Sequence, residues 1–420
     1  MRWATWTSWV ALCGLALAAC GPPPPSILLV TLDTLRRDYV GVYADAGGFT
    51  PSLDALAAEG LVHETAYTTM PTTGPAHLSL FTGLYPSEHG ARRNGETLPP
   101  RLAGAELAAR LREHGYATAA FVTSKLMSRA ATGLRGFEIY DAPTGTLRPG
   151  ENAVDAALAW LRVERRRPVF LFVHLYDAHA PYGSADEKRR SFPVERRAYG
   201  WIDEPGRYAT AEERSDMAER YARGVGSADA ALGRLVAGVR AQLEPPPFVA
   251  VVADHGETLA DHLEQRGYAY DHGEFLDAES VSVPLLLAGP GVEPGRSPGA
   301  VSIRDLYTTL LAAAGIDDGE AAAAGRRDLR RSSAARRVVG IERRRFGGAV
   351  RPEVKAQGAA AADGARLVIV AEDGDATAAP DGTPDGLLAA ARERLGRRAD
   401  RVEPLDPATR EALRDLGYAE

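Results

Sequence analysis

The sequence contains almost no cysteine. Its 420 residues include two, Cys13 and Cys20, both near the N-terminus, so the rest of the chain has no thiol for a disulfide or a thiolate metal site. Lysine is scarce beside arginine, which we attribute to compositional bias. The net charge of −7 argues against nucleic acid as a partner. Beyond the N-terminal segment, no hydrophobic run is long enough to span a bilayer. The remaining composition, 45% hydrophobic and 25% charged, is typical of a globular protein.

The N-terminus has the pattern of an export signal followed by a lipid anchor. Arg2 precedes a short apolar stretch that ends in Leu17-Ala18-Ala19-Cys20, and small residues at this place are typical of a signal peptide. Leu-Ala-Ala-Cys also resembles the lipobox of bacterial lipoproteins, whose cysteine is lipidated. We expect residues 1–19 to be a lipoprotein signal peptide, and residues 20–25 to be lipidated Cys20 with a stiff, proline-rich tether. The expected location is the cell envelope membrane; the alternative is an ordinary cleaved signal.

Strand-like and helix-like segments alternate over residues 26–315. Strands are predicted at 27–32, 116–123, 169–175, 248–253 and 283–288, and helices at 51–60, 75–81, 103–114, 152–161, 211–243 and 303–314. This alternation favours an α/β fold, a doubly wound, mostly parallel sheet with helices on both faces. Residues 316–420 are less regular. We expect them to form a smaller C-terminal α+β subdomain, with strands at 338–343 and 365–371 and a helix at 407–416.

Two of the predicted strands end on carboxylates. Asp33 follows the first strand, and Asp254 with His255 follows the strand at 248–253. Ligands of α/β proteins gather at the carboxyl ends of parallel strands, and carboxylate and imidazole groups suit a divalent cation. Thr73 lies just before a predicted helix start, where free backbone N–H groups favour an oxyanion. The set predicts a metallo-hydrolase; the alternatives are strand-end turns for the carboxylates and a plain helix N-cap for Thr73.

The same residues belong to a series of ordered motifs. In chain order these are Val30-Thr-Leu-Asp33, Thr73-Gly-Pro-Ala-His77, Thr82-Gly83, His89-Gly90, Phe172-Val-His174-Leu-Tyr-Asp177-Ala-His179-Ala-Pro181-Tyr182, Asp254-His255-Gly256-Glu257, Asp271-His272-Gly273 and Val283-Pro284. Together they resemble the sulfatase family of the alkaline phosphatase superfamily, over about residues 26–315. The resemblance implies the fold of that family and a catalytic domain at 26–315.

The chain departs from the family at the nucleophile motif. That motif reads Cys or Ser, any residue, Pro, any residue, Arg, and its first residue is oxidised to formylglycine. Here Thr73 stands first and His77 stands in place of Arg. Thr cannot become formylglycine, so none is expected. The pattern matches superfamily branches in which Thr attacks phosphorus directly, namely phosphatases, phosphodiesterases and transferases. We therefore expect Thr73 to be the nucleophile and His77 to support the bound anion.

The resemblance also implies a ligand set. Asp33, Thr73, Asp254 and His255 are expected around one divalent metal ion, with Zn or Mn favoured by the imidazole and Ca or Mg possible. Thr34 replaces a second Asp that many sulfatases have, which leaves less negative charge.

His179 and His272 are expected to face the ester and to protonate its leaving oxygen or bind the anion. An alternative places a second metal between Asp177, His179 and His272. His89 and His174 are expected to form local hydrogen bonds. Lys125 lies where sulfatases carry a catalytic Lys-x-His, but that motif is missing.

The predicted function is metal-dependent hydrolysis of a phosphate or sulfate ester through Thr73. The substrate would be a small-molecule or envelope-derived anionic ester. One alternative is a transferase that passes a phospho group to envelope substrates. Another is a non-catalytic binding lipoprotein with the same fold.

Overall fold

The computed structural model describes residues 24–44, 49–164, 166–184, 186–188, 200–202, 206–335 and 338–346, strand backbone at 354–363 and 366–371, and residues 407 and 411. The predicted signal peptide, Cys20, most of the tether and most of the predicted helix at 407–416 lie outside the described residues. Among the described helices, none is both long enough and apolar enough to cross a membrane.

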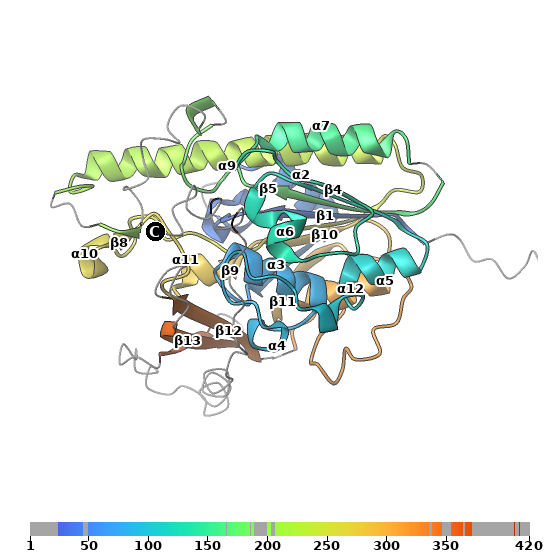
Figure 1. The fold of residues 1–420 in the computed structure, drawn as a ribbon. Helices are drawn as coiled ribbons and strands as arrows, with labels where there is room; N and C mark the ends of the chain where they lie inside the picture. Colours follow the sequence, from blue (N-terminus) through green and yellow to red (C-terminus); the bar gives the residue numbers. More distant parts are fainter. Residues whose placement is uncertain are drawn as a thin grey trace, which may run out of the picture.

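A nine-stranded sheet forms the centre of the molecule (Figure 1). Its order is β11-β2-β10-β7-β1-β5-β3-β4, with β9 beside β2. The strands are β1 Ile27–Leu32, β2 Leu61–Tyr67, β3 Ala117–Val122, β4 Ile139–Asp141, β5 Val169–Leu175, β7 Phe248–Ala253, β9 Ser282–Val283, β10 Leu285–Ala288 and β11 Gly295–Ser302. The central strands run parallel and β10 is antiparallel, which confirms the predicted mostly parallel sheet. Their nearly continuous apolar sequences follow from burial on both faces.

Helices cover both faces of this sheet. Figure 1 shows α7 and α9 along one face and α3, α5 and α12 on the other. The helices are α2 Pro51–Glu59, α3 Thr73–Thr82, α4 Pro86–His89, α5 Leu107–Glu113, α6 Arg129–Thr132, α7 Gly150–Leu161, α9 Ala211–Arg240, α10 Leu263–Arg266, α11 Ala278–Val281 and α12 Asp305–Ala313. The start of α9 is fixed by Thr210 and Glu213, which form a capping box.

Helix α3 is fixed to the sheet by aromatic packing. All ten of its residues are buried. Phe81 of α3 packs edge-on against Phe172 of β5 with ring centroids 4.9 Å apart, and against Phe137 at 5.6 Å. Such pairs add about 0.5–1.5 kcal/mol each beyond their area burial. These contacts anchor the C-terminal end of α3 on the sheet, and the same fully buried helix begins at Thr73.

Several elements differ from the sequence prediction. Helix α3 begins at Thr73 and not after it, and α5 begins at Leu107, later than the predicted residue 103. Strands β2, β4 and β11 were not predicted. β2 carries polar residues and β11 carries two glycines and a proline, so neither has the apolar run or strict alternation that identifies a strand.

The C-terminal part contributes a small antiparallel sheet of β12 Val338–Phe346, β13 Val354–Asp363 and β14 Arg366–Ala371. Both strands predicted here are found, with β13 between them. Val339 and Ile341 of β12 are buried with Tyr67, Leu276 and Val281 of the main domain. A separate two-stranded sheet joins β6 Gly200–Trp201 to β8 Tyr268–Ala269.

The register of the central strands places the predicted ligands together. Leu32, the last residue of β1, pairs with Leu175 of β5 and with Ala253 of β7. The next residues, Asp33 and Asp254, therefore leave the sheet side by side at its carboxyl edge. The segment after β5, which carries His179, leaves the sheet at the same edge.

Candidate active site

Three of the predicted metal ligands meet at this edge. Asp33, Asp254 and His255 are fully buried, and one ligand atom of each lies within 4.8 Å of the others. Burial raises the pKa of Asp33 to about 7, and burial together with the negative charge of Asp33 raises that of Asp254 to about 7. Two carboxylates in this position repel one another unless a cation or a proton separates them.

The surrounding main chain orients Asp254. Its Oδ1 accepts hydrogen bonds from the backbone N–H of Thr34 at 3.2 Å and of His255 at 2.9 Å. Thr34 has a φ of +54°, which is strained for a β-branched residue. The Tyr221 hydroxyl donates to the Thr34 carbonyl at 2.7 Å. Thr34, which replaces the second Asp of many sulfatases, therefore serves the site through its backbone.

His174 orients Asp33. Its Nε2 lies 2.8 Å from Asp33 Oδ2, and both side chains are fully buried. The sequence predicted only local hydrogen bonds for His174, which is wrong because this partner is 141 positions away. His174 of β5 pairs with Thr31 of β1, two residues before Asp33. Parallel pairing of these two strands therefore places the His174 ring near Asp33. The other histidine of that prediction, His89, does bond locally, to Ser79 Oγ at 3.1 Å.

The ligand atoms of Asp33, Asp254 and His255 that are not used in hydrogen bonds fit a divalent cation. Asp33 Oδ1 and Asp254 Oδ2 are buried without a hydrogen-bond partner in the described part of the chain. His255 Nδ1 lies 2.8 Å from the Gly256 carbonyl, so Nδ1 carries the proton and Nε2 presents a lone pair. That lone pair faces Asp254 Oδ2 at 3.3 Å, acceptor against acceptor. A cation bound by these oxygens and this nitrogen would satisfy all three, and a mixed imidazole and carboxylate set suits Zn or Mn.

Thr73 adjoins these ligands. Its Oγ1 lies 3.3 Å from His255 Nε2, and the residue is fully buried. The plain N-cap position belongs to Thr72, since Thr73 is already helical. The expectation of free N–H groups here needs correction. Asn94 Oδ1 accepts from the Gly74 N–H at 2.7 Å, and Pro75 has no N–H.

Asn94 is a site residue that the sequence prediction missed. Asn94 is 5% exposed. Its Oδ1 accepts the hydrogen bond from Gly74, which fixes the orientation of the side-chain amide and leaves Nδ2 as its other polar atom. Nδ2 is buried and has no hydrogen-bond partner in the described residues. The side chain thus offers a donor beside the N-terminus of α3. No sequence pattern marked it, because a single Asn in a loop is ordinary.

His77 is one helical turn behind Thr73. Its Nδ1 donates to the Thr73 carbonyl at 2.8 Å, and its Nε2 accepts from the Thr31 hydroxyl at 2.9 Å. Burial lowers its pKa to about 4, so the ring is neutral near pH 7. Because both ring nitrogens bind protein atoms, His77 positions Thr73 and does not itself present a donor to a bound anion.

His179 and His272 lie next to each other, beside His255. Their rings lie 5.1 Å apart, edge to face, and His272 is 4.3 Å from the His255 ring. His272 Nδ1 shares a hydrogen bond of 3.1 Å with Glu257 Oε1, and His179 Nδ1 donates to the Ala180 carbonyl at 2.7 Å. Burial lowers the pKa of both imidazoles. Each ring is therefore neutral in the free protein, and an incoming anion would favour its protonation.

Asp177 does not join these histidines. Its Oδ1 accepts from the Gly150 N–H at 3.1 Å, at the first residue of α7. A Cβ at Gly150 would lie 2.4 Å from Asp177 Oδ2, so the glycine permits this close contact. The alternative of a second metal between Asp177, His179 and His272 has no support from this geometry. The other His and carboxylate cluster found among the described residues is His262, Asp277 and Glu279.

Comparisons with known proteins give the family to which this fold belongs. The family model described as Sulfatase matches residues 25–316, so the chain belongs to the sulfatase family. It is 25% identical over 376 residues to the N-acetylgalactosamine-6-sulfatase of Sus scrofa, covering 74% of this chain and 67% of that protein. The chain therefore spans about two thirds of that relative.

Solved structures share the fold. A 2-O GAG sulfatase superposes with a TM-score of 0.64 and 17% identity, covering 92% of this chain and 96% of that one. The phosphonate monoester hydrolase of Agrobacterium radiobacter gives a TM-score of 0.62 and 18% identity, covering 94% of each chain. With this family membership, the protein is a hydrolase of sulfuric or phosphoric esters.

Proposed function

We propose that the protein is a metal-dependent hydrolase that cleaves a phosphate or sulfate ester through a covalent intermediate on Thr73. The carrying observation is the position of the Thr73 hydroxyl, 3.3 Å from His255 Nε2 and next to the two unpartnered carboxylate oxygens. The first motif position is a threonine and no cysteine lies near it, so formylglycine is not expected and the attacking group would be a side-chain hydroxyl or water. Asp33, Asp254, His255 and Thr73 would hold the cation.

A divalent cation in this place would lower the pKa of a neighbouring hydroxyl and offset the charge of the ester. The Thr73 hydroxyl would release its proton to solvent as its oxygen forms a bond to phosphorus or sulfur and the bond to the alcohol oxygen breaks. The departing alcohol takes a proton from His179 or His272. Water then attacks the Thr73 ester, releases phosphate or sulfate and restores the hydroxyl.

The remaining residues hold this arrangement. Asn94 Nδ2 is a preorganised donor for a non-bridging oxygen; losing one donor of this kind typically costs about 10²–10³-fold in kcat. Glu257 fixes the orientation of the His272 ring, and His77 fixes the helix turn that carries Thr73.

The experiment compares Thr73→Ala, Thr73→Ser and Thr72→Ala in the metal-loaded full chain. Thr73→Ala should lower kcat by about 10⁴-fold or more, as loss of a catalytic nucleophile does. Thr73→Ser should keep part of the activity because a hydroxyl remains. Thr72 is the neighbouring threonine, and its side chain makes no capping hydrogen bond to α3, so Thr72→Ala controls for losing a hydroxyl here.

Metal content should fall only modestly in Thr73→Ala, and mass spectrometry of the wild type should find an adduct on Thr73. A near-normal kcat in Thr73→Ala would instead make water the nucleophile. The substrate class follows from a screen of aryl phosphate monoesters and diesters, phosphonates and sulfates with Zn, Mn, Mg and Ca.

We further propose that the protein is an exported lipoprotein, anchored to the cell envelope by Cys20. The Leu17-Ala-Ala-Cys20 sequence and the prolines at 22–25 support this location. Cys20→Ser should move the protein from the membrane fraction to the soluble fraction. A mutant that stayed in the membrane fraction after a salt wash would place the anchor elsewhere.

A further inference from the structure

A partly buried lysine, Lys188, is bonded to the turn that carries His179. Lys188 is one of three lysines in the chain. Its Nζ donates to the Tyr176 carbonyl at 3.0 Å and to the His179 carbonyl at 2.7 Å. The His179 ring in turn stacks on Tyr176 with centroids 4.0 Å apart. The ammonium therefore closes the turn 176–179 at the carboxyl end of β5, next to the site.

This ammonium has no bonded counter-charge. In the described part of the chain, no carboxylate lies within ion-pair distance of Lys188 Nζ, and both of its hydrogen-bond acceptors are neutral carbonyls. The acidic groups that act on it at longer range are Asp177 and Asp33. Asp177 is already engaged by the Gly150 N–H. A partly buried cation without an ion-pair partner is available to attract an anionic ligand.

The charges of the other site residues indicate what role the Lys188 ammonium could have. Asp33 and Asp254 together cancel the charge of one divalent cation. His77, His179, His255 and His272 are neutral near pH 7, because burial lowers each pKa. Before a substrate binds, these groups leave the site with little net positive charge to attract a substrate that carries one or two negative charges.

We propose that Lys188 is the anion-attracting residue of this site: its ammonium, anchored to the turn that bears His179, supplies the positive charge that binds the anionic substrate and product. The inference rests on the proposed function, since it names the charge partner of the same substrate. Because Nζ touches the turn and not the reacting atoms, Lys188 is a positioning residue that also acts through its charge.

Protonation of Lys188 should then control anion binding. Burial lowers its pKa to about 8, against the opposing charges of Asp177 and Asp33. The positive charge is present below this pKa and is lost above it, so anion affinity should fall as the pH rises through 8. Glu257 titrates in the same range, because burial raises its pKa to about 8. His179, the imidazole beside Lys188, stays neutral throughout this range.

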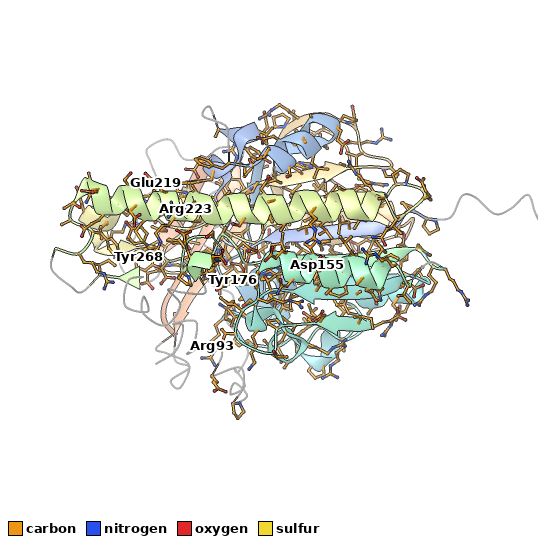
Figure 2. The ribbon with its side chains drawn as sticks, turned by 90° about the horizontal axis from the view of Figure 1, so that it is seen from above. Arg93, Asp155, Tyr176, Glu219, Arg223 and Tyr268 are labelled. Atoms are coloured by element: carbon orange, nitrogen blue, oxygen red, sulfur yellow. The ribbon has the colours of Figure 1, made fainter. Side chains whose placement is uncertain are left out.

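A surface ion pair on the same segment offers a matched control. Glu187, the residue before Lys188, accepts from Arg223 of α9 at 3.0 and 3.2 Å. Figure 2 labels Arg223 on the long helix α9. Arg223→Met removes an exposed cation of α9 that is bonded to the residue next to Lys188. This variant therefore shows the effect of loosening the segment without removing the charge of Lys188.

The test measures the affinity for inorganic sulfate by calorimetry at pH 7 and pH 9.5, on the metal-loaded full chain. Sulfate keeps its charge over this range. At pH 7, Lys188→Met should bind sulfate roughly tenfold more weakly than the wild type, while Lys188→Arg and Arg223→Met bind it similarly. From pH 7 to 9.5 the wild type should lose about tenfold, and Lys188→Arg should lose clearly less because its charge persists while Glu257 still titrates.

Equal pH dependence in the wild type and Lys188→Arg would overturn the proposal. So would wild-type affinity in a folded Lys188→Met protein. If Lys188→Met does not fold, the pH dependence of sulfate affinity in the wild type and in Lys188→Arg still tests the proposal. Sulfate binding requires no turnover, so it separates a failure of this inference from a failure of Thr73 as nucleophile.

Discussion

Two clusters of this protein bring histidine and carboxylate atoms equally close together, yet they differ in what surrounds them. In both Asp33-Asp254-His255 and His262-Asp277-Glu279, the ligand atoms lie within 4.8 Å of one another. In the second cluster, Arg266 Nη1 lies 2.6 Å from Asp277 Oδ2, and His262 Nε2 lies 2.5 Å from Glu279 Oε1. The carboxylates of the second cluster thus already have partners among the protein's own groups.

The first cluster has no such balance. Asp33 and Asp254 leave two buried oxygens without a partner, and within the described residues no arginine or lysine forms an ion pair with either side chain. We expect this difference to decide which cluster binds a metal, because short distances between ligand-type atoms do not by themselves make a metal site. What distinguishes a site is buried acceptor atoms whose charge the protein leaves uncompensated.

The largest effect should come from Asp254→Ala. One anionic ligand is lost, so the purified variant should bind no metal and show no turnover. Metal analysis and an ester assay measure the two properties. Asp277→Ala is the matched control in the second cluster and should keep the metal content of the wild type. Full activity and unchanged metal content in Asp254→Ala would remove the proposed site.

A smaller effect is expected from His174→Phe, which keeps the ring volume but removes the Nε2 donor to Asp33. Loss of a group that orients a metal ligand typically lowers metal affinity by about 10–100-fold. Titration with a competing chelator measures this affinity. His89→Phe is a suitable comparison, because His89 is equally buried but bonds to Ser79. Unchanged metal affinity in His174→Phe would mean that Asp33 is held in place by other contacts.

The smallest effect is expected from His262→Ala. Its loss removes a partly exposed hydrogen bond to Glu279, which should lower the free energy of unfolding by only about 1 kcal/mol. Metal stoichiometry should stay at one ion per chain. Denaturant unfolding and elemental analysis are the measurements. A drop from two bound ions to one would show that the second cluster also binds metal, and that the distinction drawn between the clusters is wrong.

The sequence was enough to predict the parts of the site that follow strand ends. Asp33 and Asp254 each come directly after a buried apolar run, and parallel pairing brings such ends to one edge. The mostly parallel sheet with helices on both faces followed from the alternation of the same runs with helical segments. Strands β2 and β11 were not predicted, because β2 contains polar residues and β11 contains glycine and proline. These two segments form strands through pairing with neighbouring strands and not through a hydrophobic pattern of their own.

The tertiary structure alone decided which side chains support the ligands. His174 and Asn94 are unremarkable in the sequence, and they matter because strand pairing sets His174 against Asp33 and a loop sets Asn94 against the start of α3. His77 occupies a motif position, yet its two bonds to protein atoms turn it away from the substrate role the motif implies. The local sequence determines which elements form and where they end, because that depends on periodicity and turn residues. Partners far apart in the chain depend on how the elements pack, and no local pattern records this.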